Sequence, residues 1–134
     1  MTTLNRVVNA IIHMLGLSRF RGGDLLYLTS TGRTSGAART VPLLFVRDGE
    51  DFVVAASNGG SDWEPGWWLN VQADPHATIE VAKRTISVVA SEVEEPERSV
   101  LWKRLSDQLD AYDGYQAKVR RRIAVVRLRP ETPA

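Results

Sequence analysis

The chain has 134 residues, a length typical of one globular domain, and we expect a single domain over residues 1–134. Its 17 basic and 16 acidic residues give a formal net charge of +1, which excludes the bulk basic field of a nucleic-acid-binding protein. With no cysteine and only two histidines, the sequence excludes disulfides, thiolate chemistry and a histidine metal pair. We therefore expect no bound metal, no nucleic-acid partner and a cytoplasmic location.

The N-terminal segment, residues 1–20, is predicted to form an amphipathic helix. Its apolar residues recur at helical spacing: Leu4, Val7, Val8, Ile11, Ile12 and Leu15. The run is too short for a membrane span, which needs about 20 apolar residues. Two interpretations stay open, namely a helix packed on the core or one whose apolar face, helped by Arg19 and Arg21, contacts a membrane surface or a substrate entrance.

The remaining residues, 24–129, read mainly as short strands joined by turns. Strands are expected at residues 24–30, 39–47, 51–57, 78–81, 85–93 and 123–128. Because Pro42 has no N–H to give to a ladder, its strand belongs at an edge or a bulge. The Asp48-Gly49 turn predicts a hairpin between the second and third strands.

Two helices interrupt these strands. One is expected to begin at Pro65 and to stop near Asp74, and the other to run from Pro96 to about Leu109. The apolar side of the second helix would carry Val100, Leu101, Leu105 and Leu109. This order favours a mainly β, α+β fold, an antiparallel barrel or sheet with helices outside it.

Residues 31–40 combine glycines, hydroxyls and two guanidinium groups, those of Arg33 and Arg39. Glycine lets backbone N–H groups approach a ligand, and arginine grips phosphate or carboxylate with two hydrogen bonds. The segment suits an anion, although a polar glycine-rich turn is more often only a turn.

A second unusual segment, residues 58–70, contains two glycines and, after them, a cluster of tryptophans. Trp67 and Asn70 share a face of the predicted helix, while Trp68 is expected to lie in the core. Tyr112 and Tyr115 lie between the last helix and the last strand, where a loop could cover a site. The basic run at residues 118–122 is interpreted as a solvated face, with the alternative that it reaches an acidic tail of a ligand left open. Since no nucleophile or base stands out, the chemistry is expected to come from a cofactor.

Six motifs follow one another in a recognisable order: LTSTGRTSG, ARTVPL, DG, VVAASNGG, PGWWLN and ADP. With these motifs the chain, from about residue 25 to residue 128, resembles the deazaflavin-dependent nitroreductase family, whose members reduce nitro compounds or quinones with coenzyme F-420. The resemblance implies a split β-barrel related to the FMN-binding pyridoxamine oxidases. It also implies hydride transfer from the reduced cofactor to a quinone, nitroaromatic or activated alkene.

The resemblance also implies which residues form the site. The cofactor-binding residues would be Arg33, Thr34, Ser35, Arg39, Pro42, Leu43, Leu44, Ala55, Ala56, Ser57, Asn58, Gly59, Trp67 and Asn70, with the phosphate near Arg39. Tyr112 and Tyr115 would border the acceptor and act as catalytic residues. Family members often carry lysine at the positions of Thr34 and Asn58, so one phosphate-binding charge is absent from this chain.

Other readings remain open from the sequence. The barrel could hold FMN instead of coenzyme F-420, or the chain could be a non-catalytic module that binds a cofactor or a lipid. Related barrels often dimerise across their cofactor sites, so a homodimer is a further expectation.

Overall fold

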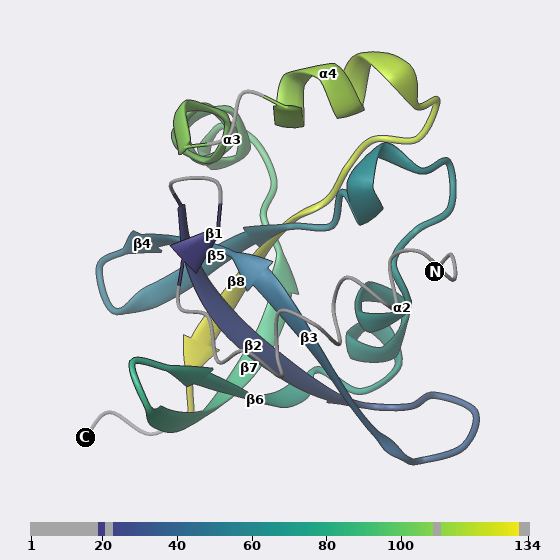
Figure 1. The fold of residues 1–134 in the computed structure, drawn as a ribbon, viewed down its shortest axis with the longest axis vertical. Helices are drawn as coiled ribbons and strands as arrows, with labels where there is room; N and C mark the ends of the chain where they lie inside the picture. Colours follow the sequence, from purple (N-terminus) through teal and green to yellow (C-terminus); the bar gives the residue numbers. More distant parts are fainter. Residues whose placement is uncertain (1–18, 21–22, 109–110, 132–134) are drawn as a thin grey trace.

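The computed structural model describes residues 19–20, 23–108 and 111–131 (Figure 1). In this part of the chain, eight strands form one antiparallel sheet. Seven follow the order β1-β2-β6-β7-β8-β5-β4, and β3 also pairs with β2. The strands are β1 (Arg19–Phe20), β2 (Gly23–Thr31), β3 (Ala38–Leu44), β4 (Val46–Asp48), β5 (Asp51–Ala55), β6 (His76–Val81), β7 (Arg84–Glu92) and β8 (Val125–Pro130). The helices are α2 (Gly66–Ala73), α3 (Glu97–Gln108) and α4 (Ala111–Lys118), with a 3-10 turn, η1, at Asn58–Gly60. The predicted antiparallel β-barrel with helices outside it is confirmed.

Two hairpins follow directly from local sequence. Gly49 adopts φ +61° in the β4–β5 turn, a conformation that glycine reaches without strain. The β6–β7 turn places Ala82 and Lys83 at φ +49° and +65°, as a two-residue hairpin loop requires. The hairpin predicted at Asp48-Gly49 is therefore confirmed, and the strands expected at residues 78–81 and 85–93 form a second one.

Alternation along β2, β5 and β8 distributes their side chains between two cores, whereas β6 and β7 alternate buried residues with exposed or half-buried ones. One core, inside the barrel, contains Leu26, Leu28, Val54, Val126 and Leu128, closed at one end by Trp67 and Trp68 of α2. The other lies beneath α3 and α4 and contains Leu25, Val53, Val125, Leu101 and Leu105. In Figure 1, α3 and α4 lie together at the top of the sheet, and α2 lies to one side. Successive residues of β2, β5 and β8 therefore face different cores, because side chains alternate along a strand.

The second expected helix is confirmed as α3, but its apolar side was predicted wrongly. Leu101 and Leu105 are buried, whereas Val100 is 63% exposed and Arg98 lies in the interior instead. Positions 98, 101 and 105 share one face of a helix, and position 100 points about 100° away from position 101. Leu109 lies outside the described residues.

Three further predictions need correction. The expected strand at residues 39–47 divides at Phe45, because β3 pairs with β2 while β4 turns away to pair with β5. The expected loop around Tyr112 and Tyr115 is the helix α4. Residues 19–20, assigned to the N-terminal helix, form β1. The division at Phe45 and the helix α4 depend on packing against β2 and η1, which local pattern does not reveal, whereas β1 forms by short-range pairing of Arg19 with Asp24.

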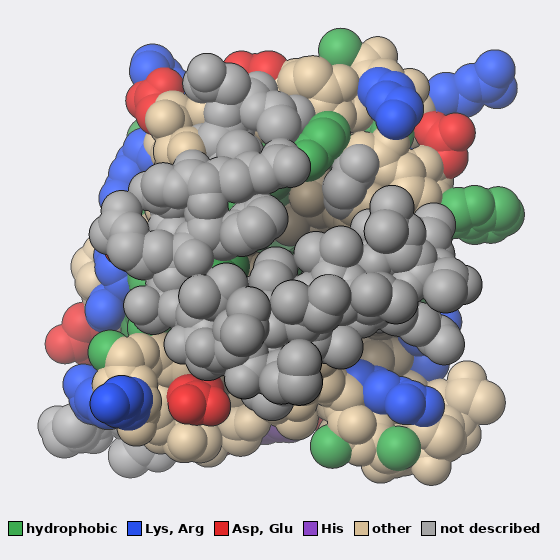
Figure 2. Space-filling model, in the orientation of Figure 1, with side chains coloured by type: hydrophobic (Ala, Val, Ile, Leu, Met, Phe, Trp, Pro, Cys, Tyr) green, Lys and Arg blue, Asp and Glu red, His purple; other side chains and the backbone are tan. Residues whose placement is uncertain are grey.

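Pro42 lies on β3, whose only described strand partner is β2, so the edge position predicted for this proline is confirmed. Residues 1–18 lie outside the described part of the chain, and the single domain and the N-terminal amphipathic helix stay predictions. Among the described residues, no helix is both long and apolar enough to cross a bilayer. On the described part of the face in Figure 2, Lys and Arg side chains lie among Asp and Glu side chains.

Candidate functional site

The loop between β2 and β3 is closed by its own backbone. The Gly32 N–H donates to the Ala37 carbonyl at 2.7 Å, and the Gly36 N–H donates to the Gly32 carbonyl at 2.8 Å. Gly36 has φ +72°, and a Cβ on Gly32 would lie 3.0 Å from the Ala37 oxygen. The Ser35 hydroxyl accepts the Ala37 N–H at 3.1 Å. The glycines of this segment therefore make a tight, defined loop rather than a flexible one.

A buried amide fixes this loop against α2. The Asn70 Oδ1 atom accepts the Arg33 backbone N–H at 3.2 Å and the Arg33 guanidinium at 2.8 Å. Its Nδ2 donates to the Ser30 hydroxyl at 3.1 Å, and both Asn70 and Ser30 are buried. The Arg33 guanidinium also donates to the Gly66 carbonyl at 3.4 Å. Asn70 thus orients Arg33 beside the cavity. These contacts also satisfy the hydrogen bonds of the buried Asn70 side chain.

The N-terminus of α2 adds backbone donors. Pro65 precedes the helix at the N-cap position, contributes no side-chain hydrogen bond, and no acidic residue lies in the first turn. The first N–H groups of a helix have no partner within the helix, and the helix dipole favours an anion there. This end of α2 is therefore suited to an anionic group.

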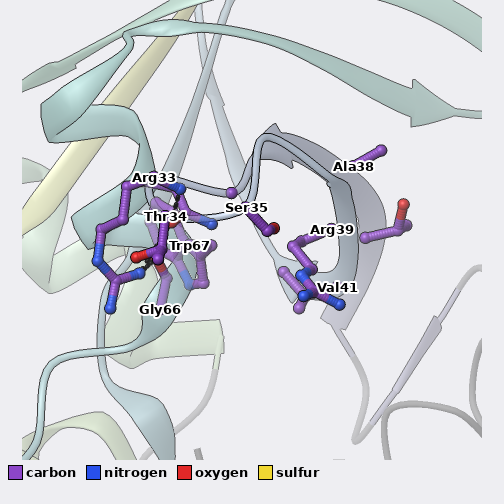
Figure 3. A pocket seen from close by; sticks show the side chains of 11 residues that line it. Arg33, Thr34, Ser35, Ala38, Arg39, Val41, Gly66 and Trp67 are labelled. Atoms are coloured by element: carbon purple, nitrogen blue, oxygen red, sulfur yellow. Dashed lines mark hydrogen bonds between the residues drawn. The ribbon is translucent and has the colours of Figure 1, made fainter.

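A cavity of about 810 Å³ lies between the β2–β3 loop, the start of β3 and the N-terminus of α2. Figure 3 shows Arg33 and Thr34 beside Gly66 and Trp67, with Arg39 and Val41 across the cavity. The cavity is lined by Gly32, Arg33, Thr34, Ser35, Ala38, Arg39, Thr40, Val41, Gly66, Trp67 and Asn70. Six of the residues named from the sequence thus lie around one cavity, with two guanidinium groups at its mouth.

Other residues named from the sequence lie elsewhere. Pro42 and Leu43 are half-buried on β3, and Leu43 packs against the barrel interior. Leu44 faces the core beneath the helices, because neighbours on a strand point to opposite faces. Among the described residues, these three side chains do not line the cavity.

The turn after β5 carries the remaining backbone positions. Ala55 pairs with Val125 in the sheet, and the Ala56 N–H donates to the Ala124 carbonyl at 2.9 Å. Ser57 precedes η1, which contains Asn58 and Gly59. The Asn58 side-chain amide donates to the Trp63 carbonyl at 3.0 Å, so it ties down the loop that leads to α2.

Arg121 lies against the turn after β5, a placement that the sequence pattern missed. Its guanidinium donates to the carbonyls of Ala56, Ser57 and Ser61, at distances between 3.0 and 3.2 Å. It was read as part of a solvated basic run, and nothing in the local pattern separates it from its neighbours. Burial lowers the pKa of Arg121, against the opposing effect of Glu64 and Asp62.

Tyr112 and Tyr115 pack edge to face on α4, with ring centroids 6.1 Å apart. Tyr112 is buried next to Trp102, and burial raises the pKa of its hydroxyl above the usual value. Tyr115 is half-buried, and a Cβ on Gly60 would lie 2.7 Å from its Cδ1 atom, so the ring lies directly against η1. Tyr115 therefore borders the turn after β5, and neither tyrosine lines the 810 Å³ cavity.

The raised pKa of Tyr112 predicts a dependence of stability on alkaline pH. The folded protein binds this proton more tightly than the unfolded chain, so the gain in stability is complete below the ordinary tyrosine pKa of about 10 and declines as pH rises above it. We expect Tyr112→Phe to flatten this decline in urea unfolding curves measured from pH 7 to 11. Equal declines in the two proteins would contradict the assignment.

In the described ranges, no group of three or more His, Asp or Glu side chains is arranged to hold a metal ion. The chemistry of the 810 Å³ cavity is therefore that of its arginines, hydroxyls and backbone donors, and it suits an anionic organic ligand.

Known proteins with a similar sequence or structure include reductases that depend on an organic cofactor. The F420H(2)-dependent quinone reductase of Mycobacterium tuberculosis is 34% identical over 104 residues, which cover 75% of this chain and 70% of the relative. A solved F420-H2 dependent reductase is 32% identical, with a TM-score of 0.71 over 78% of this chain and 92% of that one. A Listeria innocua structure that carries the name pyridoxamine 5'-phosphate oxidase has a TM-score of 0.59 at 18% identity, over 96% and 94% of the two chains. This last likeness shows the fold alone.

The fold is thus the split β-barrel of the pyridoxamine-oxidase type, as the sequence resemblance implied. Residues 6–130 match the family described as F420H(2)-dependent quinone reductase. The sequence motifs, the barrel and the arginine-lined cavity agree with this match, and the chain belongs to the F420H(2)-dependent quinone reductase family.

Proposed function

We propose that the cavity between the β2–β3 loop and α2 binds the phosphate end of coenzyme F-420. The family makes the chain an F420H(2)-dependent reductase of quinones or related organic acceptors. The observation that carries the proposed site is the pair of guanidinium groups, Arg33 and Arg39, around one cavity with the uncapped end of α2.

The residues present fit an anionic cofactor. The cavity volume of about 810 Å³ lies within the range of about 300 to 1,000 Å³ that is usual for ligand sites. Arg39 and Arg33 offer charge-assisted hydrogen bonds, and Thr34 and Ser35 add hydroxyl groups. We assign Arg39 as the principal phosphate ligand, because Arg33 already donates to Asn70.

We assign the ring of the cofactor to the adjoining surface of β3 and the turn after β5. The residues proposed for it are Pro42, Leu43 and Leu44 along β3 and the backbone of Ala55, Ala56, Ser57, Asn58 and Gly59, with Trp67 beside the phosphate end. Of the β3 residues, Leu43 is a better candidate than Leu44 for contact with the ring, because Leu44 packs in the core beneath the helices. Backbone N–H and carbonyl groups suit the polar edge of a deazaflavin ring.

Reduced coenzyme F-420, when bound, supplies a hydride; a quinone that accepts it also takes up a proton to become the hydroquinone. The protein's own part is to align the acceptor with the donor carbon and to exclude water. We propose that Tyr112 and Tyr115 border the acceptor. Tyr115 suits the proton donor better than Tyr112, because the raised pKa of buried Tyr112 disfavours release of its proton.

The proposed cofactor site is tested by a binding titration with Arg39→Ala. Loss of one charge-assisted hydrogen bond is expected to weaken binding of coenzyme F-420 by about 2 kcal/mol, which corresponds to a roughly 30-fold higher Kd. The quenching of cofactor fluorescence measures the Kd. The matched control is Arg84→Ala, which removes an exposed arginine at the β6–β7 turn that does not line the cavity.

A parallel titration with FMN separates the alternative cofactor. Tighter binding of FMN than of coenzyme F-420, or flavin released from the purified protein on denaturation, would favour the FMN reading. An Arg39→Ala Kd equal to that of the unaltered protein would contradict the proposed phosphate site. A homodimer and contact of the N-terminal segment with a membrane stay predictions.

A further inference from the structure

The turn that follows β5 is held by one guanidinium group. Arg121 donates from Nη1 to the Ala56 carbonyl at 3.0 Å and from Nη2 to the Ser57 carbonyl at 3.0 Å. Nε and Nη2 both donate to the Ser61 carbonyl, at 3.2 and 3.1 Å. The three nitrogens of this side chain thus make four hydrogen bonds to the two ends of one turn. A guanidinium has five N–H donors in a fixed planar fork, whereas an ammonium group has only three.

The backbone around Arg121 is held by the side chain of Gln116. The Gln116 side chain donates to the Arg121 carbonyl at 2.9 Å and accepts the Ile123 N–H at 2.8 Å. The neighbouring basic residues behave differently, since Arg120 is exposed and Arg122 forms an ion pair with Glu94 at the surface. Within the basic run, the structure therefore singles out Arg121 for an internal role.

The contacts of Arg121 have an electronic consequence for the turn. Among the described peptide bonds, Glu95-Pro96 is the only cis bond, so the Ala56-Ser57 bond is trans. In a trans peptide the carbonyl and the N–H point in opposite directions, so the Ser57 N–H points away from Arg121. A cation that accepts electron density from the Ala56 carbonyl polarises the peptide and strengthens the Ser57 N–H as a donor.

We propose that Arg121 is a positioning residue for the reductase: it holds the turn at residues 56–61 and makes the Ser57 N–H a stronger donor to the polar edge of the cofactor ring. The proposal rests on the proposed function, which places that edge at the turn after β5. Arg121 does not line the phosphate cavity, so its effect is confined to the ring end of the site.

The test compares two ligands: coenzyme F-420 and the deazaflavin riboside that lacks the phosphate and the glutamate tail. Arg121→Met keeps the approximate length of the side chain and removes its charge and donors. We expect it to raise the Kd of both ligands by the same factor, about tenfold. Arg121→Lys is expected to give a smaller increase, and the control Arg120→Met none. Arg39→Ala, which acts at the phosphate end, should affect coenzyme F-420 alone.

A second readout needs no cofactor. In the free protein, the amide proton of Ser57 should move upfield in the NMR spectrum of Arg121→Met, because its peptide loses polarisation, and should move less in Arg121→Lys. Thermal unfolding shows whether Arg121→Met folds, and Arg121→Lys carries the test if it does not.

The outcomes separate the two proposals. If the unaltered protein binds neither ligand, the proposed function is wrong, and the role proposed for Arg121 is wrong as well. If the unaltered protein binds both ligands and a folded Arg121 variant binds the riboside equally well, the role of Arg121 is wrong while the cofactor site stands. An unchanged chemical shift of the Ser57 amide proton in a folded Arg121→Met variant would also contradict the proposal that Arg121 polarises the Ala56-Ser57 peptide.

Discussion

Replacing Gly60 by alanine is expected to lower the free energy of unfolding by about 3 kcal/mol. Gly60 has φ +80°, a backbone conformation that costs an L-residue about 1 to 2 kcal/mol. A Cβ there would also lie 2.7 Å from Tyr115 Cδ1 and 3.2 Å from Cγ, and overpacking of this kind costs about 1 to 3 kcal/mol. Urea unfolding at neutral pH measures the loss.

The matched control for this experiment is Gly36→Ala. Gly36 has a similar φ of +72°, but a Cβ there would meet no atom within 4 Å. Its replacement should cost only the backbone strain, about 1 to 2 kcal/mol. If the two variants lose equal stability, Tyr115 does not press on η1 as the structure indicates. A further expected result is a change of acceptor KM in Gly60→Ala, because the variant displaces Tyr115.

Asn70→Ala is expected to remove about 3 kcal/mol of stability and to weaken cofactor binding at the same time. The change leaves the buried Ser30 hydroxyl and the Arg33 backbone N–H without their partner, and an orphaned buried group costs about 1 to 3 kcal/mol. It also removes the 2.8 Å hydrogen bond of the Arg33 guanidinium and leaves that group with only the longer bond to the Gly66 carbonyl. Urea unfolding and the fluorescence titration measure the two effects on one preparation.

Two further variants separate folding from binding at this position. Asn70→Asp keeps an acceptor for Arg33, and the Ser30 hydroxyl can turn to donate to it, so stability should change little. The added negative charge beside the phosphate site should nevertheless weaken cofactor binding, more at low salt than at high salt. Gln72→Ala, on the exposed side of the same helix, should alter neither quantity. Unchanged cofactor affinity in both Asn70 variants would contradict the placement of the phosphate near Arg33.

Much of the β2–β3 loop could be predicted from the chain itself. Gly32 and Gly36 mark a tight turn, and Arg33 and Arg39 mark it as attractive to an anion, because these properties belong to individual residues and their immediate neighbours. The ordered motifs then identified the family, which the comparisons confirm. The hairpin turns and α2 were predictable for the same reason, since turn geometry and helix boundaries depend on residues a few positions apart.

The partners of these residues were decided by tertiary structure. Arg33 meets Asn70 across 37 positions, and Arg121 meets Ala56 across 65, distances over which local pattern carries no information. For the same reason the basic run gave no sign that Arg121 turns inward while Arg120 and Arg122 stay at the surface. The helix α4, read as a loop, likewise depends on packing of Tyr112 and Tyr115 against distant residues.

The sequence by itself therefore determined the barrel class, the anion-attracting loop and the kind of cofactor. Only the tertiary structure decided that Arg33 and Arg39 line one cavity with α2, that Arg121 contacts the turn after β5, and that Leu43 and Leu44 face different cores. The physical reason is that backbone propensity and residue chemistry act locally, whereas burial and hydrogen-bond partners depend on how the strands pair and where the helices pack.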